Sequence, residues 1–77
     1  MEEIDAIGLL CPLPVLKLRK RLSGIDAGDE ICLLCDDPAA AVDVPHFCAE
    51  AGHGLVSVEE RGTSIAYVVR KGQGAGR

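Results

Sequence analysis

The chain has 77 residues and a net charge of −4; 48% of its residues are hydrophobic but only 3% are aromatic. This length corresponds to one small domain, whose core must be aliphatic. The negative charge argues against general affinity for nucleic acid, and no apolar run reaches the ~18 residues that a membrane span needs. We therefore expect a globular domain that neither crosses a membrane nor binds nucleic acid stably.

The N-terminal segment MEEIDAIG is acidic and has no cleavage-site pattern, so we expect no secretory signal peptide. A protein that stays in the cytoplasm keeps its thiols reduced. We therefore predict a cytoplasmic protein in which none of the four cysteines forms a disulfide.

The first half of the chain predicts a strand, a helix and a second strand. Residues 4–7 alternate as a short strand, and residues 12–22 carry Val15, Leu18 and Leu22 at helical spacing. Ser23 and Gly24 end this helix. After a turn at residues 26–29, the apolar run EICLLC at residues 30–35 is typical of a buried central strand.

The second half predicts another helix and a pair of strands. Asp37 and Pro38 are suited to the N-cap and first position of a helix over residues 39–51. Pro45 interrupts this pattern, so we expect a kink or a restart with Asp43 as the cap of the second half. Alternating residues at 55–59 and 64–70 predict two strands joined by a turn.

The resulting order, βαβαββ, predicts an α+β fold. Each helix has a single apolar stripe, so the economical arrangement is a two-layer sandwich with both helices packed on one face of a four-stranded mixed sheet. We assign residues 1–71 to this domain and residues 72–77 to a flexible glycine-rich tail.

The segment Gly8-Leu-Leu-Cys11-Pro12-Leu13-Pro14 at the start of the first helix is the most unusual part of the sequence. If the helix starts at Pro12, Cys11 is its N-cap, the two prolines stiffen its first turn, and the N–H of Leu13 is the backbone donor able to reach the sulfur. Leu13 precedes a proline and resists the helical conformation, so the helix could begin a residue or two later. Either way the helix dipole should lower the thiol pKa by less than ~1 unit from about 8.5.

This setting suits an exposed and moderately nucleophilic sulfur. Nothing in the sequence requires a histidine beside Cys11, so the paired base and oxyanion hole of a protease or esterase are missing. Accepting a sulfur atom as a persulfide and passing it on needs neither. The alternative is that Cys11 is a buried spacer between strand and helix.

The other three cysteines have a simpler interpretation. Cys32 and Cys35 have the spacing of redox and zinc motifs, but positions i and i+3 of a strand point to opposite faces. We expect these two residues and Cys48 to be buried as small hydrophobic side chains, although a redox role for the pair stays open. A zinc site combining Cys48 with His46 or His53 is disfavoured, and we expect no metal and no cofactor.

The basic stretch from Lys17 to Arg21 has two interpretations. It is usually a solvated helix face, but here it could also meet an acidic partner or RNA near the sulfur. Lys17, Lys20 and Arg21 are therefore our candidate docking residues.

Several motifs together resemble the TusA (SirA-like, YedF-like) sulfur-carrier family. They lie in this order within residues 4–71: Asp5-x-x-Gly8-Leu9-x-Cys11-Pro12-x-Pro14-Val15, Gly28-Asp29-Glu30, Asp36-Asp37-Pro38-Ala39, Asp43-Val44-Pro45-x-Phe47-Cys48 and Gly52-His53-x-Leu55.

The resemblance implies the same βαβαββ sandwich, with Cys11 carrying the persulfide. It further implies a cysteine desulfurase or rhodanese-type sulfur donor and a downstream acceptor protein in tRNA thiolation, sulfur oxidation or cofactor biosynthesis. Within this hypothesis Gly8 permits the tight junction, Pro12 and Pro14 fix the helix start, and the Leu13 amide helps to hold charge on the sulfur. Such a carrier is a sulfurtransferase only in a loose sense, and we expect a monomer.

A different class of function stays open beside the sulfur carrier. The protein could be a binding or regulatory module that uses the basic first helix as its interaction surface, with Cys11 as a structural cap.

Overall fold

The computed structural model describes residues 1–73 of the chain. It contains four strands and two helices in the predicted order βαβαββ. Their bounds are β1 (Glu2–Asp5), α1 (Leu13–Leu22), β2 (Glu30–Cys35), α2 (Ala40–Ala51), β3 (Gly54–Arg61) and β4 (Ser64–Arg70). The tail predicted at residues 72–77 lies outside the described residues from position 74 onward.

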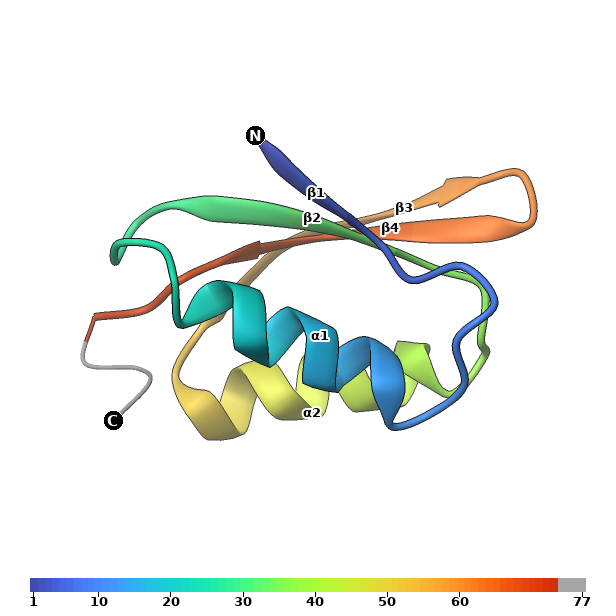
Figure 1. The fold of residues 1–77 in the computed structure, drawn as a ribbon, viewed down its shortest axis with the longest axis horizontal. Coiled ribbons are helices and arrows are strands. Elements are labelled where there is room, and N and C mark those ends of the chain that lie inside the picture. The colour runs from blue at the N-terminus through green and yellow to red at the C-terminus, as the bar shows by residue number, and fades with distance from the viewer. Residues whose placement is uncertain (74–77) are drawn as a thin grey trace.

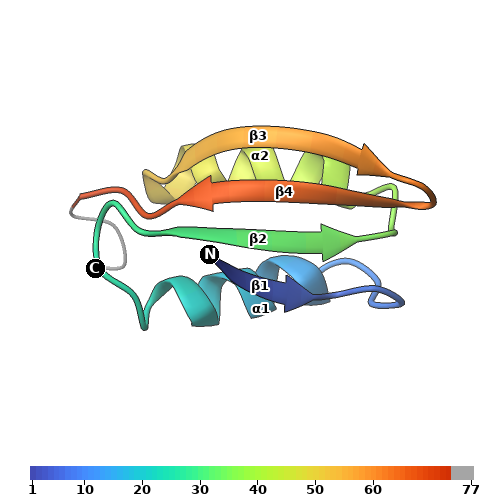
Figure 2. The ribbon, with the colours of Figure 1, turned by 90° about the horizontal axis from the view of Figure 1, so that it is seen from above.

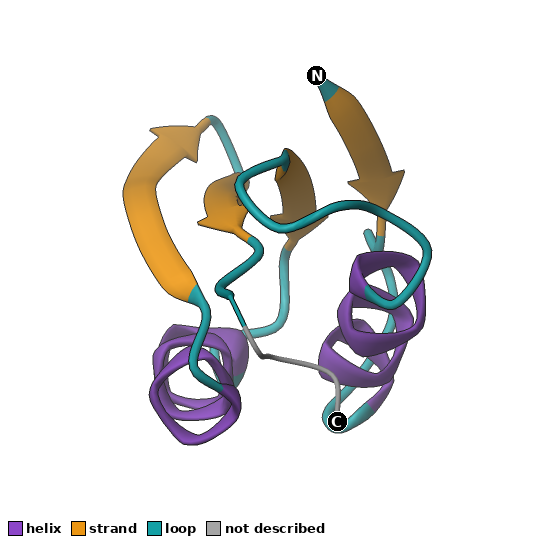
Figure 3. Ribbon diagram, turned by 90° about the vertical axis from the view of Figure 1, so that its left-hand side faces the viewer, coloured by secondary structure: helices purple, strands orange, loops and turns teal. Residues whose placement is uncertain are grey.

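The four strands form one mixed sheet in the order β1-β2-β4-β3. β1 runs parallel to β2, whereas β4 lies between β2 and β3 and is antiparallel to both (Figure 2). Both helices cover the same face of this sheet (Figures 1 and 3), with α1 on the side of β1 and α2 on the side of β3. The predicted two-layer α+β sandwich is confirmed.

The core fills the space between the helices and the sheet. Alternation along β2 directs Ile31, Leu33 and Cys35 toward the helices, whereas Cys32 points to the other face. The helix α1 contributes Leu18 and Leu22, which are buried. The rest of this core comes mainly from α2 and β4: Val44, Cys48, Tyr67 and Val69.

Helix α2 differs from the prediction at its proline. The helix is continuous from Ala40 to Ala51 with Pro45 inside it, so the predicted restart is wrong. A proline removes one intrahelical hydrogen bond, but Val44 and Cys48 on either side of it are buried in the core, and this packing stabilises the helix on both sides of the proline. Asp43 is therefore not a cap, and its side chain is available for another contact.

Neither helix of residues 1–73 combines the length and the apolar content that crossing a membrane would require.

Candidate functional site

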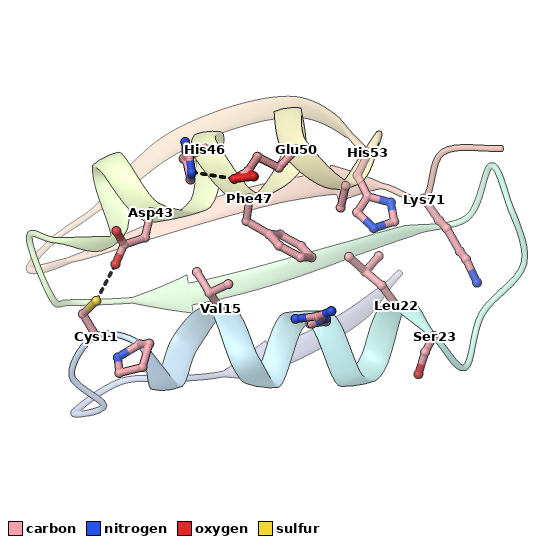
Figure 4. A pocket seen from close by; sticks show the side chains of 13 residues that line it. Cys11, Val15, Leu22, Ser23, Asp43, His46, Phe47, Glu50, His53 and Lys71 are labelled. Carbon is pink, nitrogen blue, oxygen red and sulfur yellow. Dashed lines mark hydrogen bonds and ion pairs between the residues drawn. The ribbon is translucent and has the colours of Figure 1, made fainter. Parts of the chain in front are cut away.

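A groove of about 660 Å³ runs between α1 and α2 on the side away from the sheet. Its floor is apolar, since Val15 and Leu22 of α1 face Phe47 of α2 across it (Figure 4). Cys11 lies at one end, and Lys71 lies at the other. The remaining lining residues are mostly polar or charged: Pro12, Arg19, Ser23, Asp43, His46, Glu50, Ala51 and His53.

The Cys11 thiol is exposed and donates a hydrogen bond to a carboxylate on the opposite helix. The distance from Sγ of Cys11 to Oδ2 of Asp43 is 2.6 Å (Figure 4). Cys11 is not a buried spacer, and the predicted exposed sulfur is what the structure contains. The sulfur is exposed to solvent and lies at one end of the groove.

The expectation of a lowered thiol pKa is wrong. The hydrogen bond to Asp43 raises the pKa of Cys11 above its ordinary value, and desolvation and the negative charges of Asp43 and Asp37 act in the same direction. The physical reason is that a carboxylate accepts from a thiol but repels a thiolate. The dipole of α1 does not reverse this effect, because a helix terminus contributes little at an exposed site.

The backbone around the sulfur also departs from the prediction. Helix α1 begins at Leu13, its N-cap is Pro12 rather than Cys11, and the Cys11–Pro12 peptide bond is cis. The Leu13 N–H donates to the carbonyl oxygen of Leu10 at 2.8 Å. The proposed role of the Leu13 amide as a donor to the sulfur is therefore wrong, because this donor is already in use. Pro14 is buried.

Two neighbouring aspartates after β2 hold the backbone of the loop that carries Cys11. Asp36 Oδ1 accepts the N–H of Gly8 at 2.9 Å, and Asp37 Oδ2 accepts the N–H of Cys11 at 2.7 Å. Gly8 has φ of +82°, a conformation in which a side chain would be strained. With Asp43 on the sulfur, three carboxylates from one region of the chain fix the loop at both its backbone and its side chain.

Asp37 also orders the start of α2. Its other carboxylate oxygen, Oδ1, accepts the N–H of Ala39 at 3.1 Å, and its backbone carbonyl accepts the N–H of Ala40 at 3.0 Å. The predicted N-cap at Asp37 and first helical position at Pro38 are wrong, because α2 begins at Ala40 with Ala39 as its N-cap. Asp37 instead binds the turn before the helix, and the sequence did not indicate its contact with Cys11.

The predicted docking residues do not line the groove. Lys17 Nζ donates to the carbonyl oxygen of Asp5 at 3.3 Å, and Arg21 forms an ion pair with Glu2. Lys20 is exposed. The basic residue of α1 that does line the groove is Arg19, which we did not single out from the sequence.

The other three cysteines are buried and free. Burial raises the pKa of each of these thiols, that of Cys35 to about 11. Thiols with such pKa values are almost fully protonated at neutral pH and hence poor nucleophiles. Among residues 1–73, no three His, Cys, Asp or Glu side chains are arranged to hold a metal ion.

Two hydrogen bonds lie at the end of the groove away from Cys11. His53 Nδ1 accepts the N–H of Gly72 at 3.2 Å, and Lys71 Nζ donates to the carbonyl oxygen of Ile25 at 2.7 Å. Burial and the nearby charge of Lys71 lower the pKa of His53. These contacts attach the segment after β4 to the rest of the fold.

Sequence reasoning missed Asp43 as a site residue. Its position before Pro45 suggested a local helix cap, whereas its partner lies 32 residues earlier in the chain. The spacing of Asp43, His46 and Glu50 along one side of α2 is the signal that could have been used, since these residues share a helix face.

Comparison with known protein families shows which family this chain belongs to. The family model described as sulfurtransferase TusA matches residues 2–71. The chain belongs to the TusA family. Its structure is similar to the crystal structure of a SirA-like protein from Desulfitobacterium hafniense, with a TM-score of 0.82 and 26% sequence identity over 95% of this chain and 100% of that chain.

Membership in the TusA family supports a sulfur-carrier role, because TusA proteins relay sulfur to partner proteins. The family match spans both the Cys11 loop and the aspartates that hold it. The match therefore covers every residue that lines the Cys11 end of the groove.

Proposed function

We propose that this protein is a cytoplasmic sulfur carrier that accepts sulfane sulfur on Cys11 as a persulfide and relays it to an acceptor protein. The observation that carries the proposal is the contrast among the cysteines: Cys11 is exposed, whereas Cys32, Cys35 and Cys48 are buried. Transfer of sulfur between proteins requires an accessible sulfur, because the two reacting sulfur atoms must meet in line.

The site also fits carriage better than hydrolysis. The imidazole of His46 is engaged with Glu50 at 2.9 Å, and the hydrogen-bond partner of the Cys11 sulfur is a carboxylate rather than a histidine. A hydrolytic cysteine needs a base that shares its proton and donors for an oxyanion. A carrier needs only a sulfur that can be reached by successive partners.

The proposed partners are a sulfur donor and a sulfur acceptor. The donor is a cysteine desulfurase or a rhodanese-type protein, and the acceptor acts in tRNA thiolation, sulfur oxidation or cofactor biosynthesis. We assign docking to the exposed basic face of α1, with Lys17, Lys20 and Arg21, in a carrier that acts as a monomer.

The test is to incubate the protein with a cysteine desulfurase and cysteine and to measure its intact mass. We expect one added sulfur atom, which a reductant removes and which the Cys11→Ser variant does not gain. The matched control is Cys32→Ala, which leaves Cys11 in place and should still gain the sulfur. If neither a desulfurase nor a rhodanese-type donor adds sulfur to the folded protein, it is a binding module and not a carrier.

A further inference from the structure

Asp43 has a contact with Cys11 that the proposed function alone does not explain. It projects from α2 toward the N-terminal end of α1 (Figure 4), and its Oδ2 receives the thiol hydrogen at 2.6 Å. The Asp43 side chain is half-buried and lies on the side of α2 that lines the groove. A carboxylate facing a nucleophilic sulfur at this distance must influence the protonation of that sulfur.

We propose that Asp43 is a positioning residue of the sulfur carrier. In the empty carrier it holds Cys11 as a protonated thiol through the hydrogen bond, and this hydrogen bond breaks when Cys11 is loaded with a persulfide. The loading step of this inference rests on the proposed function. The contact itself rests on the observed geometry of the Cys11–Asp43 pair.

The chemistry of loading explains why the contact cannot survive it. In loading, the Cys11 thiolate attacks the outer sulfur of a donor persulfide, a new S–S bond forms at Sγ, and the donor's S–S bond breaks. The donor protein's own cysteine sulfur leaves with the electron pair of the broken S–S bond and takes up one proton from solvent. This proton balances the one that Cys11 gave to solvent, so no net oxidation occurs. Sγ then carries no hydrogen, and the hydrogen bond to Asp43 is lost.

The charges around the sulfur favour the same separation. Asp37 lies on the backbone side of Cys11, and Asp43 lies on the groove side. Farther along the groove are Arg19 of α1 and the His46–Glu50 pair of α2, with His53 and Lys71 at the other end. The groups nearest to the sulfur are thus carboxylates, which repel an anionic persulfide and favour a loaded sulfur that points away from the groove.

The first experiment measures the rate of Cys11 alkylation by iodoacetamide between pH 6 and 10. We expect Asp43→Asn to react about fivefold faster than the wild type at pH 7, because one nearby negative charge is removed, and both proteins to reach similar rates at high pH. Asp43→Glu should restore part of the slow reaction. Asp26→Asn, the same substitution in an exposed turn, should behave like the wild type.

An Asp43→Asn profile equal to that of the wild type would overturn the inference. A slower reaction in Asp43→Asn would also contradict it, since it would make Asp43 a general base. Circular dichroism of each variant separates these results from unfolding.

The second experiment follows the contact itself. Methyl methanethiosulfonate converts Cys11 into an S-methylthio disulfide, in which Sγ carries no hydrogen, as in the persulfide. We expect amide resonances near Asp43 to shift in the wild type, and the same resonances to shift much less in Asp43→Asn. Equal shifts in both proteins would contradict the inference. Neither experiment uses a sulfur donor, so failure of the carrier proposal and failure of this inference are distinguishable.

Discussion

The backbone N–H of Cys11 donates to Oδ2 of Asp37 at 2.7 Å, across 26 residues of the chain. The other oxygen of the same carboxylate accepts the N–H of Ala39. One side chain therefore ties the loop that carries Cys11 to the segment just before α2.

Replacing Asp37 tests this connection. We expect Asp37→Ala to lower the free energy of unfolding by about 1 kcal/mol, because its carboxylate no longer accepts the N–H groups of Cys11 and Ala39, and to speed hydrogen exchange at the Cys11 amide. Urea denaturation and amide exchange measure the two effects. Glu60→Gln, an exposed substitution on β3, is the control and should leave both unchanged. Unaltered exchange at Cys11 in Asp37→Ala would show that the loop is held without this carboxylate.

The helix layer depends on Leu18, which is fully buried between α1 and the sheet. We expect Leu18→Ala to lower the free energy of unfolding by about 2–4 kcal/mol, because a buried leucine leaves a cavity when truncated. For a domain of this size that is a large share of the total stability. Leu16→Ala, on the exposed side of the same helix, should change stability by less than about 0.5 kcal/mol. Similar losses in both variants would be inconsistent with the described packing.

The buried thiols predict a loss of stability in alkaline solution. Burial raises the pKa of Cys35 to about 11 in the folded protein, well above the ordinary value for a thiol. In this range the unfolded chain loses the proton first, so the stabilising contribution is complete below pH 9 and is lost as the pH rises toward 11. The free energy of unfolding should fall by up to about 1.4 kcal/mol per pH unit for this group.

Urea denaturation of Cys35→Ala provides the comparison, since this variant lacks the titrating thiol. We expect its stability to decline less steeply between pH 9 and 11 than that of the wild type. Parallel curves for the two proteins would show that another group controls the alkaline transition.

The proposed docking surface on α1 predicts a dependence on salt. Lys20→Gln should slow sulfur transfer from the donor by about two- to threefold at low ionic strength and by less at high ionic strength, because steering between exposed charges is screened. Alkylation of Cys11 by neutral iodoacetamide should stay the same.

The control is Thr63→Asp, which makes the same change in net charge on the turn between β3 and β4. If Thr63→Asp slows transfer as much as Lys20→Gln, net charge and not a docking surface is responsible. Equal transfer rates in Lys20→Gln and the wild type would remove Lys20 from the surface.

Much of the fold could be predicted from the sequence because it depends on local patterns. The strands at residues 30–35 and 64–70 have the predicted bounds, since short apolar runs are strong strand signals. The strand β1 begins and ends two residues earlier than predicted, and β3 is longer than predicted at both ends. Pro45 was misjudged because the packing of α2 on the sheet compensates for one missing hydrogen bond.

The candidate site was predictable only in part. The sequence pointed to Cys11 as an exposed sulfur, but its pKa shift was predicted in the wrong direction. The helix dipole can be inferred from residues next to Cys11, whereas the carboxylates of Asp37 and Asp43 reach it only through the folded chain. Likewise the N–H of Leu13 looked available because its acceptor, the carbonyl of Leu10, depends on the turn that the loop adopts.

The order of these groups along the chain has a consequence for synthesis. Cys11 precedes all three aspartates that contact its loop, and α2 supplies the last of them. A nascent polypeptide that has left the ribosome only as far as β2 therefore presents an ordinary, unrestrained thiol. The setting that distinguishes Cys11 is completed when α2 docks beside α1, so the raised pKa and the hydrogen-bonded position of this thiol depend on a finished tertiary structure.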